Sequence, residues 1–326
     1  MSDLRKALNP NNASGPLRVV SIGGGTGLST LLHGLKQYVR GHGVRNWPLD
    51  IAAIVTVTDD GGSSGRLRRE FDVLPPGDIR NCLVALSEDE GLLSRLFQYR
   101  FETGRGLKGH SFGNLFLTAL TRITGDFPDA VKESSEVLAI KGRIYPATAD
   151  NVALEATLEN GRHVLGETKI SKSRRRIVSV RLRPRRCRPL PDTLAAIAQA
   201  DVITLGPGSL FTSVIPNLLV SGITKAIQRS PAVKAYFVNL MWQPGETTNF
   251  TAADTREIRR SLLRRYARQE SAPVENDFNE INALGVNVVC GDYVEESALV
   301  RHNSDAIAAI AIELAMEGRK RRQKSR

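Results

Sequence analysis

The stretch VVSIGGGTGLSTLLHGL, residues 19–35, decides the fold of this chain. It joins a short apolar run, a cluster of glycines and a set of apolar residues at helical spacing. The apolar residues at i, i+3, i+4 and i+7 are Leu28, Leu31, Leu32 and Leu35. This pattern predicts a helix that begins near Gly27 and packs its apolar face against the preceding strand. The stretch therefore predicts a strand, a turn and a helix.

The glycine-rich turn of this unit suits an anion. Glycine permits positive φ and a close approach of the backbone, and a helix start presents free N–H groups at the positive end of its dipole. The spacing gives neither GxGxxG nor the lysine of a Walker loop, so the standard NAD pattern is absent. The alternative to phosphate binding is a tight turn that serves packing alone. The candidate ligand residues in the turn are Gly24, Gly25, Thr26 and Gly27.

Length and composition favour a large α/β domain, with or without a smaller appendage. The chain has 326 residues, enough to bury a sizeable core. Its three cysteines are far apart and form no CxxC pair, which argues against a disulfide framework or a cysteine zinc site. No apolar run approaches the roughly 20 residues of a membrane span, and the first residues lack a signal-peptide core. We therefore expect a cytoplasmic protein without a membrane span.

The net charge of +11 is concentrated in two runs. Residues 172–188 hold nine Lys or Arg and no acid, and residues 318–326 hold six more, so the rest of the chain is mildly acidic. Basic runs can bind nucleic acid nonspecifically, but neither run carries the interleaved aromatics of a single-strand binding surface. We favour a solvated strand edge and a loose tail, with nucleic-acid binding as the alternative.

A second polar loop, TDDGGSSGR, follows the apolar run of residues 51–57, which is typical of a buried parallel strand. The loop leaves the carboxyl end of its strand, so it would face the same crevice as the glycine turn. Asp59 and Asp60 are candidate ligand-binding or catalytic carboxylates, and their oxygens could hold Mg²⁺, the one cofactor considered. The alternative is a polar surface turn.

The segment VLPPGDIRN, residues 73–81, predicts a loop and the start of another helix. Asp78 would cap this helix, and Arg80 and Asn81 would lie in its first turn. Because the helix dipole disfavours a cation there, Arg80 should pair with a carboxylate of the preceding loop or with an anionic ligand.

A further glycine-rich segment, GRGLKGHSFGNLFL, covers residues 104–117 and leads into a helical pattern. Its polar side chains of interest are His110 and Asn114. His110 is either a participant in chemistry or an ordinary packed residue, and the sequence leaves both interpretations open.

Residues 150–190 predict a small antiparallel β appendage. Segments 153–159 and 162–167 flank Asn160-Gly161, which is the strongest hairpin signal in the chain. Residues 177–183 alternate apolar and polar side chains, as in a third, half-exposed strand. The appendage therefore carries the first basic run.

A second strand, turn and helix unit begins at Asp201. The buried strand 201–205 runs into the turn GPGS, and an apolar helix follows to Ile227. Because this unit repeats the first one, a phosphate could accept hydrogen bonds from its amides and hydroxyls. The candidate ligand residues are Gly206, Gly208, Ser209, Thr212 and Ser213.

The remaining segments complete the predicted organisation. Residues 233–240 and 286–289 predict strands, a long basic helix follows Thr251, and residues 305–316 predict a closing helix. The expected domains are a flexible leader over 1–16, one α/β domain with its appendage over 17–317, and a basic disordered tail over 318–326.

Taken in order, these loops resemble those of the YvcK-like gluconeogenesis factors, a family that shares its fold with the CofD 2-phospho-L-lactate transferases. The resemblance covers roughly residues 17–317, and so many loop motifs in one order are highly specific. The motifs are GGGTGLS (23–29), TDDGGSSGRLR (58–68), PPGDIRNCL (75–83), KGHSFGNL (108–115), GPGSLFTSVIPNLL (206–219), QPGET (243–247) and VRH (300–302).

The resemblance implies a Rossmann-like CofD fold, with a mostly parallel sheet that binds a nucleotide-linked ligand across its loop face. For the YvcK-like branch it implies UDP-sugars such as UDP-N-acetylglucosamine. It also implies a cytoplasmic role in cell-wall precursor balance and cell shape during growth on gluconeogenic carbon sources. Tyr266 and Arg301 look like the family's aromatic and guanidinium contacts to the nucleotide sugar.

Three functions follow as hypotheses. The favoured one is a nucleotide-sugar-binding regulator without turnover, because the loops offer few aromatic residues for a flavin-like acceptor. The second is a Mg²⁺-dependent transferase of the CofD type, which moves a phospho-lactyl group from a nucleoside-diphosphate carrier to a hydroxyl. The third is a nucleic-acid-binding protein that uses the basic runs. A homo-oligomer is compatible with each.

Overall fold

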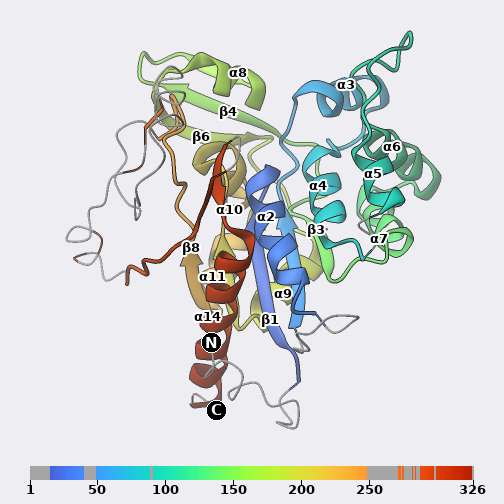
Figure 1. Ribbon diagram of the computed structural model, residues 1–326. Helices are drawn as coiled ribbons and strands as arrows, with labels where there is room; N and C mark the ends of the chain where they lie inside the picture. Colours follow the sequence, from blue (N-terminus) through green and yellow to red (C-terminus); the bar gives the residue numbers. More distant parts are fainter. Residues whose placement is uncertain are drawn as a thin grey trace.

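The computed structural model describes residues 15–39, 49–88, 91–247, 271–272, 274, 281, 283, 287–296 and 299–324. Its centre is a five-stranded sheet in the order β3-β2-β1-β7-β8, and every neighbouring pair is parallel (Figure 1). The strands are β1 (Leu17–Gly23), β2 (Leu49–Val55), β3 (Arg143–Pro146), β7 (Val202–Leu205) and β8 (Val233–Tyr236). The predicted Rossmann-like, mostly parallel α/β class is confirmed.

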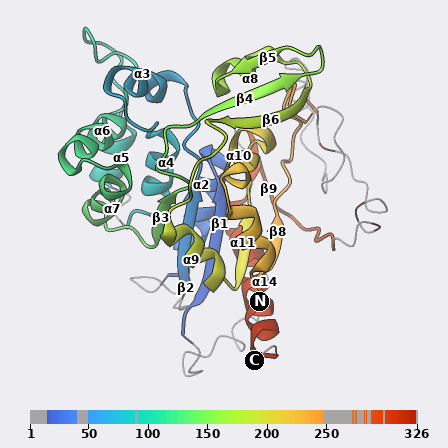
Figure 2. The same cartoon turned by 180° about the vertical axis from the view of Figure 1, so that it is seen from behind.

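Helices cover both faces of this sheet, as the continuous apolar runs of β1 and β2 require. Helices α2 and α14 pack on one face, and α9 and α11 lie on the other (Figures 1 and 2). The helices of these layers are α2 (Gly25–Lys36), α4 (Gly77–Leu86), α9 (Pro191–Gln199), α11 (Ile223–Arg229) and α14 (Ser304–Lys324). The four leucines that the sequence assigns to the inner face of α2 are all fully buried.

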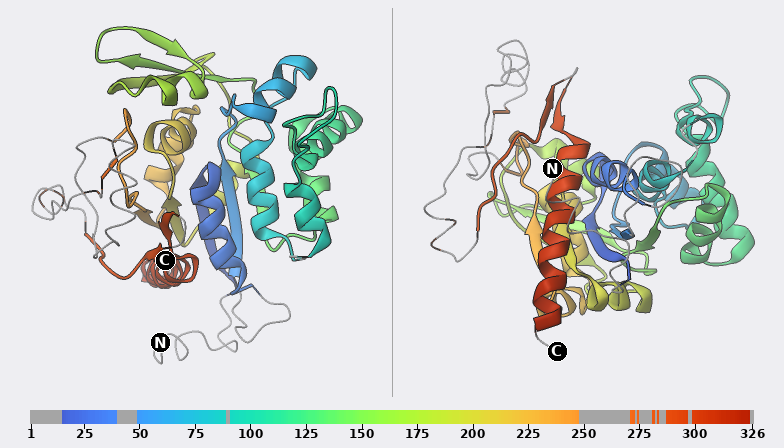
Figure 3. Two further views of the ribbon diagram at one scale, coloured as in Figure 1. Left: turned by 45° about the horizontal axis from the view of Figure 1, so that its top comes forward. Right: turned by 60° about the horizontal axis from the view of Figure 1, so that its bottom comes forward.

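A second group of helices lies beside α4 at one side of the molecule (Figure 3). Its members are α3 (Gly62–Phe71), α5 (Leu92–Gln98), α6 (Phe112–Thr124) and α7 (Phe127–Val137). Ser63 of α3 contacts His110 just before α6, which joins the second polar loop to the third glycine-rich segment. No single described helix is long and apolar enough to cross a membrane; residues 210–219 and 223–229 meet that test only as a bent pair.

The β appendage forms as predicted and lies over the carboxyl ends of the central strands (Figure 1). Its three antiparallel strands, in the order β5-β4-β6, are β4 (Ala153–Leu158), β5 (His163–Leu165) and β6 (Ile177–Arg183). The predicted second strand ends early, because Gly166 has a φ of +101° and turns the chain into a short helix, α8 (Glu167–Ser173). The appendage therefore contributes a helix to the loop edge of the sheet.

Three expectations for the second half of the chain need correction. The apolar helix predicted after the GPGS turn is broken into η1 (Leu210–Val214), α10 (Ile215–Leu219) and α11, with Gly222 at a φ of +90° before α11. The strand predicted over 233–240 ends at Tyr236. Residues 287–289 form no strand, and the described strands nearby are the antiparallel pair β9 (Val294–Glu296) and β10 (Val300–His302). The basic helix predicted after Thr251 lies outside the described residues.

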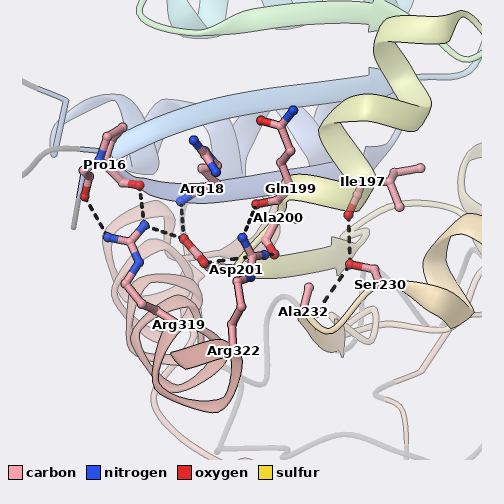
Figure 4. A network of polar contacts seen from close by, with 11 residues as sticks. Pro16, Arg18, Ile197, Gln199, Ala200, Asp201, Ser230, Ala232, Arg319 and Arg322 are labelled. Atoms are coloured by element: carbon pink, nitrogen blue, oxygen red, sulfur yellow. Dashed lines mark hydrogen bonds and ion pairs between the residues drawn. The ribbon is translucent and has the colours of Figure 1, made fainter. Parts of the chain in front are cut away.

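The basic tail predicted as disordered is helical from residue 318 to Lys324, as part of α14. Two of its arginines, Arg319 and Arg322, dock on the buried carboxylate of Asp201 (Figure 4). The Arg319 guanidinium donates to Asp201 Oδ2 at 2.6 Å, and the backbone N–H of Arg18 donates to the same oxygen at 2.9 Å. These charges therefore fasten the last helix across the start of β1 and β7.

Candidate functional site

The two glycine turns meet at the carboxyl edge of the sheet. Strands β2 and β3 extend the sheet on one side of β1, and β7 and β8 extend it on the other, so the strand order reverses between β1 and β7. Ligands of open α/β sheets bind at such a switch point. A Cβ atom on Gly27 would lie 2.4 Å from the Pro207 carbonyl oxygen, and one on Gly208 would lie 3.4 Å from the Gly24 carbonyl oxygen. The two turns therefore form one backbone surface.

The second glycine turn is braced by the segment that contains QPGET. Gln243 Nε2 donates to Ser209 Oγ at 2.6 Å, and Asn239 Nδ2 donates to the Gly208 carbonyl oxygen at 2.9 Å. Glu246 accepts from the Phe211 N–H at 3.2 Å and from Thr212 Oγ1 at 3.4 Å. The turn residues are thus fixed before any ligand arrives, and Glu246 is a residue that the sequence analysis did not assign to the site.

Asp78 lies directly under the first glycine turn. Its carboxylate accepts a hydrogen bond from the Gly25 N–H, and a Cβ atom on Gly24 would lie 2.6 Å from its Oδ2 atom. Burial, and then the nearby Asp59, raise the pKa of Asp78 to about 7. The sequence predicted a helix cap here, but Asp78 lies in the first turn of α4, whose N-cap is Pro76. The structure therefore adds a titratable carboxyl group to the loop edge.

We expect Asp78→Asn to flatten the pH dependence of stability. The folded state keeps the Asp78 proton until about pH 7, whereas the unfolded chain releases it near pH 4. This group therefore stabilises the fold fully below about pH 4 and loses that contribution as the pH rises to about 7. The free energy of unfolding, measured with urea, should fall between pH 5 and pH 8, and this fall should be larger in wild type than in Asp78→Asn by about 1–3 kcal/mol.

The variant retains an acceptor for the Gly25 N–H, so it removes the titration without removing the hydrogen bond. Glu133→Gln, at an exposed position on α7, is the matched control and should decline as wild type does. An equal fall in the free energy of unfolding in wild type and Asp78→Asn would show that this carboxyl group does not titrate between pH 5 and pH 8.

The structure separates the two aspartates that the sequence paired. Asp59 Oδ1 accepts from the Gly61 N–H at 2.8 Å, and a Cβ atom on Gly77 would lie 2.7 Å from Asp59 Oδ2. Asp60 Oδ1 instead accepts from the Thr168 N–H at 2.8 Å, so it anchors the appendage. Carboxylate oxygens suit Mg²⁺, but within the described ranges no three His, Cys, Asp or Glu side chains are grouped to hold a metal ion. Magnesium binding stays a prediction.

Arg80 lies on α4, and its side chain reaches the segment before α6. Its Nη1 atom donates to Ser111 Oγ at 2.7 Å and its Nη2 atom donates to Asn81 Oδ1 at 2.6 Å, while Nε is buried without a partner. Burial lowers the pKa of Arg80, and Asp78 opposes that change. Arg80 and Asn81 thus form a hydrogen-bonded pair at the site, and the charges of Asp78 and Asp59 also attract Arg80. An anionic ligand as the partner of Arg80 stays a prediction.

His110 and Asn114 lie in the buried wall formed by α3 and α6. His110 Nδ1 is 2.9 Å from Ser63 Oγ, and burial, followed by the charge of Arg66, lowers the pKa of this histidine. Asn114 is 2% exposed, and its Nδ2 atom donates to Ser64 Oγ at 3.4 Å. The Oδ1 atom of Asn114 is buried without a hydrogen-bond partner. Both predicted residues therefore lie beside the second polar loop, and Asn114 presents an unused acceptor.

Asn217 is a further residue that the sequence analysis missed. It is fully buried, and its Nδ2 atom donates to the Gly23 carbonyl oxygen at 3.0 Å and to the Ser213 carbonyl oxygen at 2.8 Å. It therefore ties the end of β1 to the turn after β7. The motif GPGSLFTSVIPNLL includes this asparagine. A single asparagine among apolar residues of a predicted helix is the sequence feature that could have indicated its role.

Arg301 lies on β10, on the β8 side of the glycine turns. The Nε2 atom of the neighbouring His302 lies 3.0 Å from the carbonyl oxygen of Val238. This contact places β10 beside the segment after β8. Arg301 is exposed, in register with Glu295 of β9. Tyr266 lies outside the described residues.

These features define a Rossmann-like α/β protein whose loop edge carries two packed glycine turns. Residues 19–257 match the family model of the 2-phospho-L-lactate transferase CofD. The gluconeogenesis factor of Halalkalibacterium halodurans is 45% identical over 94% of this chain and 98% of its own length. The gluconeogenesis factor of Bacillus subtilis is 44% identical over 92% of this chain and 98% of its own length.

The structural comparison agrees with the sequence matches. A crystal structure of a UPF0052 family member from Bacillus halodurans has a TM-score of 0.85 and 45% identity, and it covers 91% of this chain and 99% of its own. The chain therefore belongs to the YvcK-like gluconeogenesis factors of the CofD family.

Proposed function

We propose that this protein binds a nucleotide sugar of the UDP-N-acetylglucosamine type at the loop edge and acts without turnover. Its role would be that of a cytoplasmic factor in cell-wall precursor balance and cell shape. The observation that carries the proposal is the packing of two glycine turns at the switch point, with Gly27 against Pro207. Backbone N–H groups at such a point suit a diphosphate.

The surrounding side chains suggest how the ligand would lie. The diphosphate would accept from backbone N–H groups of the two glycine turns other than those of Gly25, Gly206 and Phe211, which donate to Asp78, Ile22 and Glu246. Arg301 on the β8 side would pair with a phosphate. Tyr266 would stack on a ring. On the opposite side, Asp59, Asn81 and Asn114 would face hydroxyl groups. The unpartnered Oδ1 atom of buried Asn114 supports this orientation, because a ligand donor would remove the cost of an unsatisfied acceptor.

Calorimetry with UDP-N-acetylglucosamine, UDP-glucose, GDP and NAD, each with and without Mg²⁺, tests the proposal. We expect the UDP-sugars to bind and to be recovered intact after long incubation. Arg301→Ala should weaken UDP-sugar binding by about 10-fold, since a charge-assisted hydrogen bond to phosphate is lost. Arg122→Ala, at an exposed position on α6, is the control and should bind as wild type does. Unchanged affinity in Arg301→Ala would remove this residue from the site.

A transferase of the CofD type is the second candidate, and the raised pKa of Asp78 is the observation that favours it. A carboxyl group with a pKa of about 7 is suited to general acid or base catalysis near neutral pH. The family model that matches residues 19–257 is also that of a transferase. Release of free nucleotide from a nucleoside-diphosphate donor on incubation with the protein would favour this activity over binding alone.

A further inference from the structure

The β appendage places a carboxylate over the candidate site. Glu167 is the first residue of α8, and the helix lies above the carboxyl ends of the central strands (Figure 1). The appendage is held to the loops after β2 and after β8, by the Thr168 N–H on Asp60 Oδ1 at 2.8 Å and by the Ile177 N–H on the Gly245 carbonyl oxygen at 3.2 Å. The appendage that carries Glu167 is therefore anchored on both sides of the loop edge.

The Oε2 atom of Glu167 is buried and has no hydrogen-bond partner in the described part of the chain. Burial is the largest cause of its strongly raised pKa, and the other causes are Asp78, Asp59, Glu246 and Asp60, all of them carboxylates. A buried acceptor without a donor is costly, so a ligand that supplies donors would be stabilised there. A phosphate supplies only further negative charge, whereas hydroxyl and amide groups supply hydrogen-bond donors.

Asn114 gives an independent sign of the same kind. Its buried Oδ1 atom also lacks a partner, and its Nδ2 atom reaches Ser64 Oγ at 3.4 Å. A Cβ atom on Gly77 would lie 2.5 Å from that Ser64 oxygen and 2.7 Å from Asp59 Oδ2, so the asparagine lies near Asp59, one of the carboxylates whose charge acts on Glu167. Two buried oxygens without hydrogen-bond partners therefore belong to residues near Asp59.

We propose that Glu167 accepts hydrogen bonds from the hydroxyl-bearing part of the ligand, beyond the diphosphate, and so makes the β appendage a specificity element of the site. The proposal rests on the proposed nucleotide-sugar binding. A sugar with neighbouring hydroxyl groups is the chemical class that satisfies Glu167 and Asn114 together.

The test compares UDP with UDP-N-acetylglucosamine by calorimetry on the full-length protein and two variants, Glu167→Gln and Glu167→Ala. We expect Glu167→Ala to weaken UDP-N-acetylglucosamine binding by about 10- to 100-fold and to change UDP binding by less than about 2-fold, because only the sugar contact is lost. Glu167→Gln keeps an acceptor oxygen, so it should weaken UDP-N-acetylglucosamine binding by less than Glu167→Ala does. Glu159→Gln, at an exposed position beside the hairpin turn of the same appendage, is the matched control and should leave both affinities unchanged.

Thermal unfolding separates this role from a structural one. Glu167→Gln should keep or raise the melting temperature, because it removes a carboxyl group whose ionised form is disfavoured by burial and by the charges of other carboxylates. A lowered melting temperature with equal loss of both ligands would assign Glu167 to the fold, and unchanged affinities would remove it from the site; either result overturns the inference. Wild-type protein that binds neither ligand would instead overturn the proposed function on which it rests.

Discussion

Gly27→Ala is expected to lower the free energy of unfolding by about 1–3 kcal/mol and to weaken nucleotide-sugar binding by at least about 10-fold. The added Cβ atom would lie 2.4 Å from the oxygen and 2.7 Å from the carbon of the Pro207 carbonyl group, and 3.0 Å from the Gly208 nitrogen. All three are backbone atoms, so no side chain can rotate away. The two glycine turns must therefore separate, although alanine within α2 would otherwise favour the helix by up to about 1 kcal/mol.

Urea unfolding and calorimetry with UDP-N-acetylglucosamine measure the two effects. Gly23→Ala is the stability control from the same turn, since its Cβ atom would meet nothing closer than Leu28 Cβ at 3.5 Å, an ordinary contact. We expect that control to unfold within about 1 kcal/mol of wild type. Wild-type stability in Gly27→Ala would mean that the turns are not packed together, and the proposed diphosphate surface would then fail.

The sequence predicted the central sheet and the position of the two glycine turns for local reasons. Residues 19–22 and 51–55 are apolar runs long enough for strands, each followed at once by glycine or polar residues. The carboxyl ends of parallel strands share one edge, so the turns after β1, β2 and β7 had to lie together. The Asn-Gly turn likewise marked the hairpin of the appendage.

The roles of Asp78, Glu167 and Glu246 could not be predicted, because they depend on contacts distant in sequence. Asp78 was assigned to a helix cap, since only the packing of α4 under the first glycine turn brings it to the Gly25 N–H. The sequence predicts a strand at Glu167. In the structure, Gly166 turns the chain into α8, and the Thr168 N–H donates to Asp60, which is 108 residues away in the sequence. The hydrogen bond from Arg80 to Ser111 was missed for the same reason, because Ser111 is 31 residues away.

Asp201→Ala is expected to lower the free energy of unfolding by about 3–5 kcal/mol, because it leaves two arginines without their buried counter-charge. The Asp201 side chain is 2% exposed, and the side chains of Arg319 and Arg322 are 17% and 19% exposed. The loss also removes the acceptor of the Arg18 N–H at the start of β1 (Figure 4). The charge run at residues 318–326 predicted a loose tail because composition alone does not reveal that a buried acid before β7 will pair with it.

The matched control for Asp201→Ala is Glu317→Ala, which breaks the Glu317–Arg321 pair on the exposed side of α14. That pair lies one helical turn apart with side chains 49% and 60% exposed, so its loss should cost less than about 0.5 kcal/mol. Hydrogen exchange should then show the end of α14 opening in Asp201→Ala and closed in the control. Equal unfolding free energies in the two variants would mean that residues 318–324 contribute no more than a solvated helix end, and the original prediction of a loose tail would hold after all.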